Sequence, residues 1–392
     1  MRLSASTLLA LCAVTPAQDP APLGSGPLLC YVVVDEGVHR LTAVELEPPG
    51  TPRELCRSPA PVRVLQRLDR DHLLLSTGDA LVLLDAAAGA MQALLATTAD
   101  RFVAVHGDDV LVLGDARGEA PWLPDNHLYA VPWRGTAPRR RIGAERFATV
   151  PIVAGNLAIA LDASERELWA ISLNRLQERR LTTLPDGDHS ARVALSPDGA
   201  RLAIGSVAQN GRGRLRVVDA ATGRSQQQWD DLPIGLSPLS SFAPTLEVAW
   251  HDATHVVCSE SRGDTRGLDG SFVHVRRDVG TGAIVDETVY SGLELYHRLP
   301  QPELPSTGLT VATLDDTLEL RRLGTDAALR SVPRSGKTAA DLVAAPDGRF
   351  AAACRLVDGT FRLELWTADP AAAPRDLGPG RAEGWAWLEA SR

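Results

Sequence analysis

The chain has 392 residues, of which 44% are hydrophobic and 23% are charged, so it can bury a large core and is not a long disordered tract. Its formal net charge is −9 at pH 7, and an acidic surface repels nucleic-acid backbones and anionic lipid. The composition therefore argues against nucleic acid as a partner and against membrane insertion.

The first 17 residues have the layout of a secretory signal peptide. Arg2 precedes an apolar run from Leu8 to Val14, and small residues lead up to Ala17. We predict cleavage after Ala17, with a short core helix as the alternative, and a linker over residues 18–27. No other apolar run approaches the roughly 18 residues that a membrane span needs. The expected location is therefore periplasmic or secreted, without an anchor.

A turn of the form Asp-x-x-x-Gly closes an apolar strand at three places, over residues 85–89, 219–223 and 278–282. A second turn, with Pro-Asp-Gly at 197–199 and 346–348, is followed at once by another strand. In such turns Pro presets one φ angle, Gly accepts a positive φ, and Asp caps the turn with its carboxylate. Recurrent turns between short strands predict a ring or array of small sheets.

The turns mark eight repeating units, each of roughly 40 to 55 residues and about four strands, the size of a propeller blade. The chain opens at residues 28–35 with what reads as the second strand of a unit, and it closes with a lone strand at 384–388. We predict that this last strand completes the first unit. The predicted fold class is all-β, a single β-propeller domain over residues 28–392 with eight four-stranded blades, or seven as the alternative count.

The stretch from Leu195 to Ala203, with its Ser-Pro-Asp-Gly turn, resembles the WD-repeat-like β-propellers. Propellers of this type occur in the periplasmic Tol–Pal translocation protein and in prolyl-oligopeptidase-like enzymes. The resemblance is good at residues 196–199 and 345–348, and it implies a fold but no chemistry. Both families carry an additional α/β domain for which this chain has no room, so their activities do not carry over.

No catalytic or phosphate-binding motif stands out. The segment 235–239 lacks the second glycine of a nucleophile elbow, and the segment 336–338 lacks the upstream glycine of a phosphate-binding loop. His251 and His255 have a spacing that could suit a metal on a helix, but here we expect them to flank a tight turn between strands. We therefore predict no catalytic residues, no metal site and no cofactor.

Four cysteines follow the signal peptide, and three of them lie in apolar strand patterns that suit buried free thiols. An exported protein could also form disulfides. Cys30 with Cys354 is the pair to check, because both fall on equivalent strands of units that would be neighbours.

Three long polar connections, at residues 114–127, 206–214 and 259–271, each join the second and third strands of a unit. We therefore expect them on one face, together with a later connection that contains His297. Function concentrates on loops held by a rigid scaffold, and mixed Arg and Asp suit a protein contact better than a metal cage. The candidate binding residues are Trp122, Asp125, Asn126, Asn210, Arg212, Arg262, Asp264, Arg266, Asp269 and His297.

The sequence thus favours a non-enzymatic, exported scaffold that binds a protein or a cell-envelope component. One alternative is a lactonase, lyase or glycosidase that uses the central channel, and another is a structural domain of a larger assembly. Channel enzymes gather carboxylates, histidines or a metal on their inner strands. The predicted inner strands at 102–106 and 193–195 offer mostly aliphatic residues, which favours the scaffold.

Overall fold

The computed structural model describes residues 15–16, 21–77, 80–96, 101–115, 126–135, 137–148, 151–234, 246–262, 271–291, 309–313, 317–322, 328–333, 341–345, 349–367, 369 and 371–389. Every regular element in these ranges is a β-strand. The strands form eight antiparallel sheets, here named A to H in chain order. Two compact units share them: a terminal unit, Met1–Thr98 with Leu304–Arg392, and a middle unit, Ala99–Glu303.

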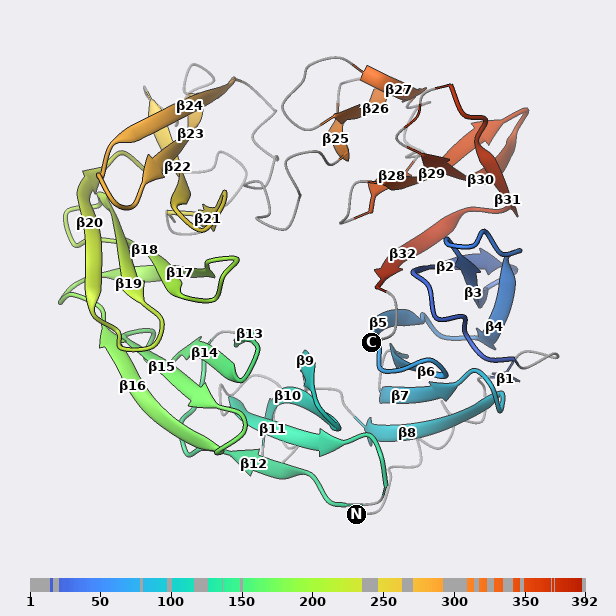
Figure 1. The fold of residues 1–392 in the computed structure, drawn as a ribbon, viewed down its shortest axis with the longest axis horizontal. Coiled ribbons are helices and arrows are strands. Elements are labelled where there is room, and N and C mark those ends of the chain that lie inside the picture. The colour runs from blue at the N-terminus through green and yellow to red at the C-terminus, as the bar shows by residue number, and fades with distance from the viewer. Residues whose placement is uncertain are drawn as a thin grey trace. The chain divides into compact units, whose positions relative to one another are not determined.

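The terminal unit holds sheets A, B, G and H (Figure 1). In B, G and H successive strands lie side by side, whereas sheet A has the order β1-β4-β3-β2-β32. Sheet A contains β1 (Thr15–Pro16), β4 (Arg53–Ser58), β3 (Val38–Glu45), β2 (Leu28–Asp35) and β32 (Ala382–Leu388); sheet B contains β5 (Arg63–Arg67), β6 (His72–Ser76), β7 (Ala80–Asp85) and β8 (Ala90–Ala96); sheet G contains β25 (Leu309–Thr313), β26 (Thr317–Arg322) and β27 (Ala328–Pro333); sheet H contains β28 (Asp341–Ala344), β29 (Phe350–Val357), β30 (Thr360–Thr367) and β31 (Arg375–Pro379).

The middle unit repeats the same plan in sheets C to F. Sheet C contains β9 (Arg101–His106), β10 (Asp109–Asp115), β11 (Asn126–Pro132) and β12 (Arg140–Ile142); sheet D contains β13 (Ile152–Ala154), β14 (Leu157–Leu161), β15 (Glu167–Ser172) and β16 (Gln177–Thr183); sheet E contains β17 (His189–Leu195), β18 (Arg201–Val207), β19 (Gly213–Asp219) and β20 (Ser225–Leu232); sheet F contains β21 (Val248–Trp250), β22 (His255–Arg262), β23 (Ser271–Asp278) and β24 (Ile284–Ser291). Eight such sheets make the protein a β-propeller, as the turn pattern predicts.

Neighbouring sheets pack face to face through apolar side chains. In the middle unit, separate clusters join C to D, D to E, and E to F. Trp250 lies fully buried between sheets E and F, where its indole Nε1 donates a hydrogen bond to the Ala194 carbonyl at 3.0 Å. Trp250 therefore packs between two blades, and alternation along each strand explains how one sheet supplies two such cores.

Sheet A contains both ends of the propeller sequence. Its inner strand β32 pairs antiparallel with β2, with Leu388 opposite Leu28 and Ala386 opposite Cys30. The prediction that the C-terminal strand completes the N-terminal blade is therefore confirmed. At the outer edge β1, within the predicted signal peptide, pairs with β4; cleavage after Ala17 stays a prediction.

Residues 21–27, in the segment expected to be a linker, lie against sheets A and B. Leu23 is buried in the apolar cluster between these sheets, and Ala21 N donates to Ala86 O at 3.0 Å. The largely buried Arg67 guanidinium donates to the carbonyls of Gly24 and Gly26. The segment is thus fixed by backbone hydrogen bonds and apolar burial.

The Asp-x-x-x-Gly turns have the geometry expected from their residues. Asp219 Oδ1 accepts hydrogen bonds from Thr222 N at 2.7 Å and Thr222 Oγ1 at 2.8 Å, and Gly223 has a φ of 73°. In the Ser-Pro-Asp-Gly turn, Ser196 Oγ donates to Asp198 Oδ1 at 2.6 Å, and Gly199 has a φ of 70°. The equivalent turn at 346–348 lies outside the described residues.

His251 and His255 flank the turn between β21 and β22, as expected, and Asp252 caps this turn. Partial burial raises the pKa of the Asp252 carboxyl, but hydrogen bonds from the backbone and side chains of Thr254 and His255 outweigh that effect and lower the pKa to about 2. The ionised carboxylate therefore stabilises the fold above the unfolded pKa of about 3.9, and this contribution is lost as the pH falls through about 2.

Replacement of this carboxylate, Asp252→Asn, is expected to lower the free energy of unfolding at pH 7. The free energy should also fall less steeply between about pH 5 and pH 2 than in the unaltered protein, because the variant has no carboxylate to protonate at this position. Urea denaturation across this pH range would measure both effects. Parallel profiles for the two proteins would contradict the assignment. Asp286→Asn, at an exposed residue of the same sheet, is the control.

The four described cysteines are free and buried. Burial raises the pKa of the thiols of Cys30, Cys56 and Cys258 to about 12, so they are poor nucleophiles at neutral pH. The suggested Cys30–Cys354 pairing is wrong. Cys30 faces the core between sheets A and B, whereas Cys354 belongs to the core between sheets A and H.

Candidate functional site

The hairpin between β18 and β19 carries two of the candidate residues, Asn210 and Arg212. Ala208 N donates to Arg212 O, and Gly211 N donates to Ala208 O, both at 2.8 Å. The φ of Gly211 is 75°, a left-handed conformation that glycine adopts without strain. The Asn210 side-chain oxygen accepts a hydrogen bond from Arg212 N at 3.0 Å. The hairpin is therefore tight and internally bonded.

Both candidate side chains also hold this hairpin against Asp231 at the end of β20. Asn210 Nδ2 donates to Asp231 Oδ1 at 3.1 Å, and Arg212 donates to Asp231 O from Nε at 3.2 Å and from Nη2 at 2.8 Å. Asp231 itself has a φ of 57°. We call the exposed residues 209–212 with Asp231 the E rim. Its shape is set before any partner arrives.

A hydrogen-bond network next to the E rim connects the strands of sheet E at the end where the hairpin lies. The buried Asp188 carboxylate accepts hydrogen bonds from Ser206 Oγ and from Arg214 Nη1, each at 2.7 Å. Arg214 Nε donates to Asp230 Oδ1 at 2.6 Å. Hydrogen bonds from Gln228 and from Arg214 lower the pKa of Asp230. The Asp230 carboxylate is therefore charged and paired at neutral pH, which suits support of the rim and not proton transfer.

His189 and Ser190 begin the inner strand of the same sheet and form the nearest approach to a nucleophile and base. The His189 Nδ1 and Ser190 Oγ atoms lie 3.0 Å apart. Ser190 has a φ of 53° at a break in the register between His189 and Arg192. A nucleophilic pair needs a third group that orients the base. The adjacent Asp188 is committed to Ser206 and Arg214, so no such relay is formed by the described residues.

The remaining candidates are only partly described. Asn126 starts strand β11, opposite Asp115, and its carbonyl accepts a hydrogen bond from Phe147 N at 2.8 Å. Arg262 ends β22 opposite Ser271. Ladder pairing therefore extends farther into the connections 114–127 and 259–271 than we expected. Trp122, Asp125, Asp264, Arg266, Asp269 and His297 lie outside the described residues.

Sequence reasoning missed the supporting residues Asp188, Ser206, Arg214 and Asp230. Their side chains meet because antiparallel pairing brings residues far apart in sequence together, with Ser206 opposite Arg214. Asp188 next to Gly187 reads only as a turn. Within the described part of the chain, no group of His, Cys, Asp and Glu could hold a metal ion, and no helix is long and apolar enough to cross a membrane.

Comparison with solved structures supports the fold. A structure of the dihydro-heme d1 dehydrogenase NirN in complex with DHE is similar over 98% of this chain and 82% of that chain, with a TM-score of 0.57 and 18% identity. A crystal structure of the eukaryotic initiation factor is similar over 93% of this chain and 99% of that chain, with a TM-score of 0.55 and 12% identity. At these identities the similarity shows the fold alone.

TolB from Acinetobacter baumannii also matches, over 92% of this chain and 66% of that chain, but with a TM-score of 0.34 and 12% identity it carries no argument. No family model and no curated protein sequence matches the chain. Activity must therefore be argued from this protein's own residues.

Proposed function

We propose that this protein is an exported, non-enzymatic β-propeller that binds a protein or a cell-envelope component through the E rim and the neighbouring connection of sheet F. The observation that carries the proposal is the fixed hairpin at Asn210 and Arg212, fastened to Asp231 at three hydrogen bonds. A surface that is already ordered loses little conformational entropy on binding.

The charge and exposure of the rim support a protein partner. Residues 209–212 and Asp231 are exposed, and Arg212 with Asp231 gives the rim both signs of charge. Arginine is enriched in protein interfaces and among the residues that dominate binding energy. The paired carboxylates beneath the rim and the incomplete His189–Ser190 pair offer no evident acid, base or nucleophile, which further favours binding.

The test is capture of partners by the tagged protein from its native envelope extract, with cross-linking and mass spectrometry. We expect one saturable partner near equal stoichiometry, cross-linked at residues 209–212 or in the connection 263–270. The variant Arg262→Ala/Arg266→Ala should weaken its apparent affinity about tenfold or more, since interface arginines often contribute more than about 1 kcal/mol each.

Arg175→Ala/Arg224→Ala is the matched control, because it removes two exposed arginines from turns at the opposite ends of sheets D and E. The control should bind as the unaltered protein does. Equal capture by both double variants would remove the sheet F connection from consideration. A clean blank with the unaltered protein would oppose the scaffold proposal and favour an enzyme of the central channel.

A further inference from the structure

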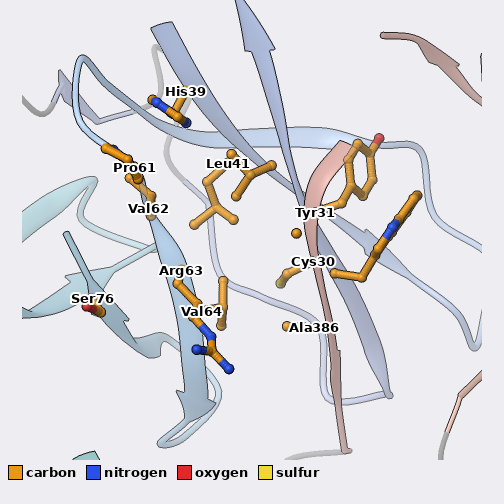
Figure 2. A pocket seen from close by; sticks show the side chains of 13 residues that line it. Cys30, Tyr31, His39, Leu41, Pro61, Val62, Arg63, Val64, Ser76 and Ala386 are labelled. Carbon is orange, nitrogen blue, oxygen red and sulfur yellow. The ribbon is translucent and has the colours of Figure 1, made fainter. Parts of the chain in front are cut away.

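A cavity of about 530 Å³ lies in the terminal unit, between the inner strands of sheets A and B. Val62 and Val64 of sheet B and Cys30 and Leu41 of sheet A line it (Figure 2). All four belong to the apolar core between the two sheets, and burial raises the pKa of the Cys30 thiol to about 12. These residues bring no reactive group to the cavity, whereas the exposed hairpin of sheet E contains one.

The hairpin of the E rim contains a dipeptide with a chemistry of its own. The chain has four asparagines, and only Asn210 is followed by glycine; the others are Asn126, Asn156 and Asn174. The backbone nitrogen of the following residue can attack the asparagine side-chain carbon and close a succinimide ring, because both groups lie in one short segment. A side chain on that residue hinders the approach, and glycine has none. The pair Asn210–Gly211 is therefore the most reactive of its kind in the sequence.

The reacting atoms lie in a turn that is open to water. Residues 209–212 are exposed, and Gly211 N donates to Ala208 O at 2.8 Å. This hydrogen bond engages the attacking nitrogen, so the reaction requires a local opening of the turn. Exposed hairpins with few buried contacts open at low cost in free energy.

The backbone of Arg212 favours ring closure once the turn is open. Arg212 N donates to Asn210 Oδ1 at 3.0 Å. Negative charge develops on this oxygen as the new bond to Cγ forms, and a donor that is already in place stabilises such charge. The donor lies only two residues from Asn210, so a break of the bond between Gly211 and Ala208 does not remove it.

We infer that Asn210 is a site of spontaneous deamidation that alters the E rim. The Gly211 nitrogen gives up its proton and bonds to Asn210 Cγ, while the bond from Cγ to Nδ2 breaks and the side-chain nitrogen leaves as ammonia with that proton. Water then opens the succinimide at one of its two carbonyls and leaves aspartate or isoaspartate. In sum, one water supplies OH in place of the amide NH2, and no oxidant or cofactor is consumed.

Both products disrupt the contact with Asp231. Asn210 Nδ2 now donates to Asp231 Oδ1 at 3.1 Å, and a second carboxylate in its place would set two like charges side by side, which repel. Isoaspartate also brings the side-chain methylene into the main chain, and so lengthens a turn that the hydrogen bond from Ala208 N to Arg212 O closes at 2.8 Å. The rim therefore changes as the protein ages. A loss of partner binding with age is the one consequence that rests on the proposed function.

Deamidation is measured on the full chain, aged at a slightly acidic and a slightly alkaline pH, by peptide mapping with mass spectrometry. We expect it at Asn210 at least about tenfold faster than at the exposed Asn174, which precedes Arg175. The rate should rise with pH, because the Gly211 nitrogen must lose its proton. Enzymatic methylation of isoaspartate identifies the second product.

Gly211→Ala should slow deamidation of Asn210 at least about tenfold, because the new side chain hinders the attack. Gly199→Ala is the matched control. Gly199 and Gly211 have φ angles of 70° and 75°, and a Cβ atom at either position meets nothing within 4 Å. Both variants thus bear the same backbone strain, and the control should deamidate at Asn210 as the unaltered protein does.

Hydrogen exchange at the amides of Ala208 and Gly211 measures the effect on the rim. Asn210→Asp should speed this exchange at least about fivefold. The exchanged pair Asn210→Asp/Asp231→Asn should bring it back to within about twofold, because one amide and one carboxylate again share the contact.

The inference is overturned if Asn210 persists as long as Asn174, if Gly211→Ala deamidates as fast as the unaltered protein, or if Asn210→Asp leaves the exchange unchanged. Failure of the exchanged pair to restore slow exchange would overturn the role of Asp231. These measurements need no partner, so a failure of the proposed binding function would leave their outcome unaffected.

Discussion

Deletion of residues 384–392 should lower the melting temperature by about 15 °C or more. The deletion removes most of β32, the inner strand of sheet A, and leaves one edge of β2 without its ladder partner, while the pairing of β2 with β3 remains. It also removes Trp385 and Trp387 from the core between sheets A and H, and Leu388 from the core between A and B. Truncating a buried Leu or Trp costs about 2–5 kcal/mol, against a total stability of about 5–15 kcal/mol.

Thermal unfolding followed by circular dichroism measures this effect. For a chain of at least 150–250 residues, a loss of 1 kcal/mol in the free energy of unfolding lowers the melting temperature by about 2–4 °C. Deletion of residues 390–392 alone is the control, since β32 ends at Leu388. That shorter deletion should leave the melting temperature within about 2 °C. An unchanged melting curve for the longer deletion would show that sheet A does not depend on its C-terminal strand.

Arg277→Met should destabilise the middle unit by about 3–5 kcal/mol, because it would leave the carboxylate of Glu260 buried and unpaired. The two side chains form an ion pair in sheet F, with 8% of the arginine and 11% of the glutamate side chain exposed. Cys258 Sγ lies 3.5 Å from Glu260 Oε1, and the Arg277 guanidinium lies 5.8 Å from the centre of the Trp229 ring. Few other groups can compensate for a lost partner.

Urea denaturation of the single variants and of Glu260→Gln/Arg277→Met gives a double-mutant cycle. The double variant should recover at least about half of the loss, because no charge is then left buried. Arg276→Met is the control: its 3.4 Å pair with Asp286 is more exposed, so it should cost under about 1 kcal/mol. If Arg277→Met and Arg276→Met lower the free energy of unfolding equally, the buried ion pair contributes no more than the exposed one.

Much of the fold could be predicted because the residues of each turn determine the geometry of that turn. Asp219 and Gly223 each meet a requirement of the same turn, one by accepting hydrogen bonds and the other by its positive φ. The first unit lacks an inner strand before residue 28, and one strand is left over at 384–388. The turn pattern shows both facts, so the pairing of the two segments could also be predicted. Strand alternation then accounts for the cores between sheets.

Face and register could not be predicted so well. Cys30 and Cys354 occupy equivalent strands, yet they belong to different cores, because moving one position along a strand reverses the direction of a side chain. In the same way, Asn210 and Arg212 read as free loop residues until β20 brings Asp231 beside them. The connection 263–270, which carries most of the sheet F candidates, lies outside the described residues.

Strand β32 illustrates a further limit of prediction from the sequence. Gly384 lies in the sequence Glu-Gly-Trp-Ala-Trp, where it reads as a weak point of a strand. Only pairing with β2 shows that it borders open space, with Val32 as its neighbour. A missing side chain becomes informative when the structure shows what its absence leaves open.

Sheet A combines strands from two distant parts of the chain, β2 and β32, and this affects folding during synthesis. Strand β2 leaves the ribosome first, and its partner β32 follows more than 340 residues later. Throughout that interval the strand Leu-Leu-Cys-Tyr-Val-Val-Val has an unpaired edge. Apolar edges of this kind recruit other chains. Biogenesis of this protein should therefore depend on a chaperone that shields residues 28–34 until β32 has been made.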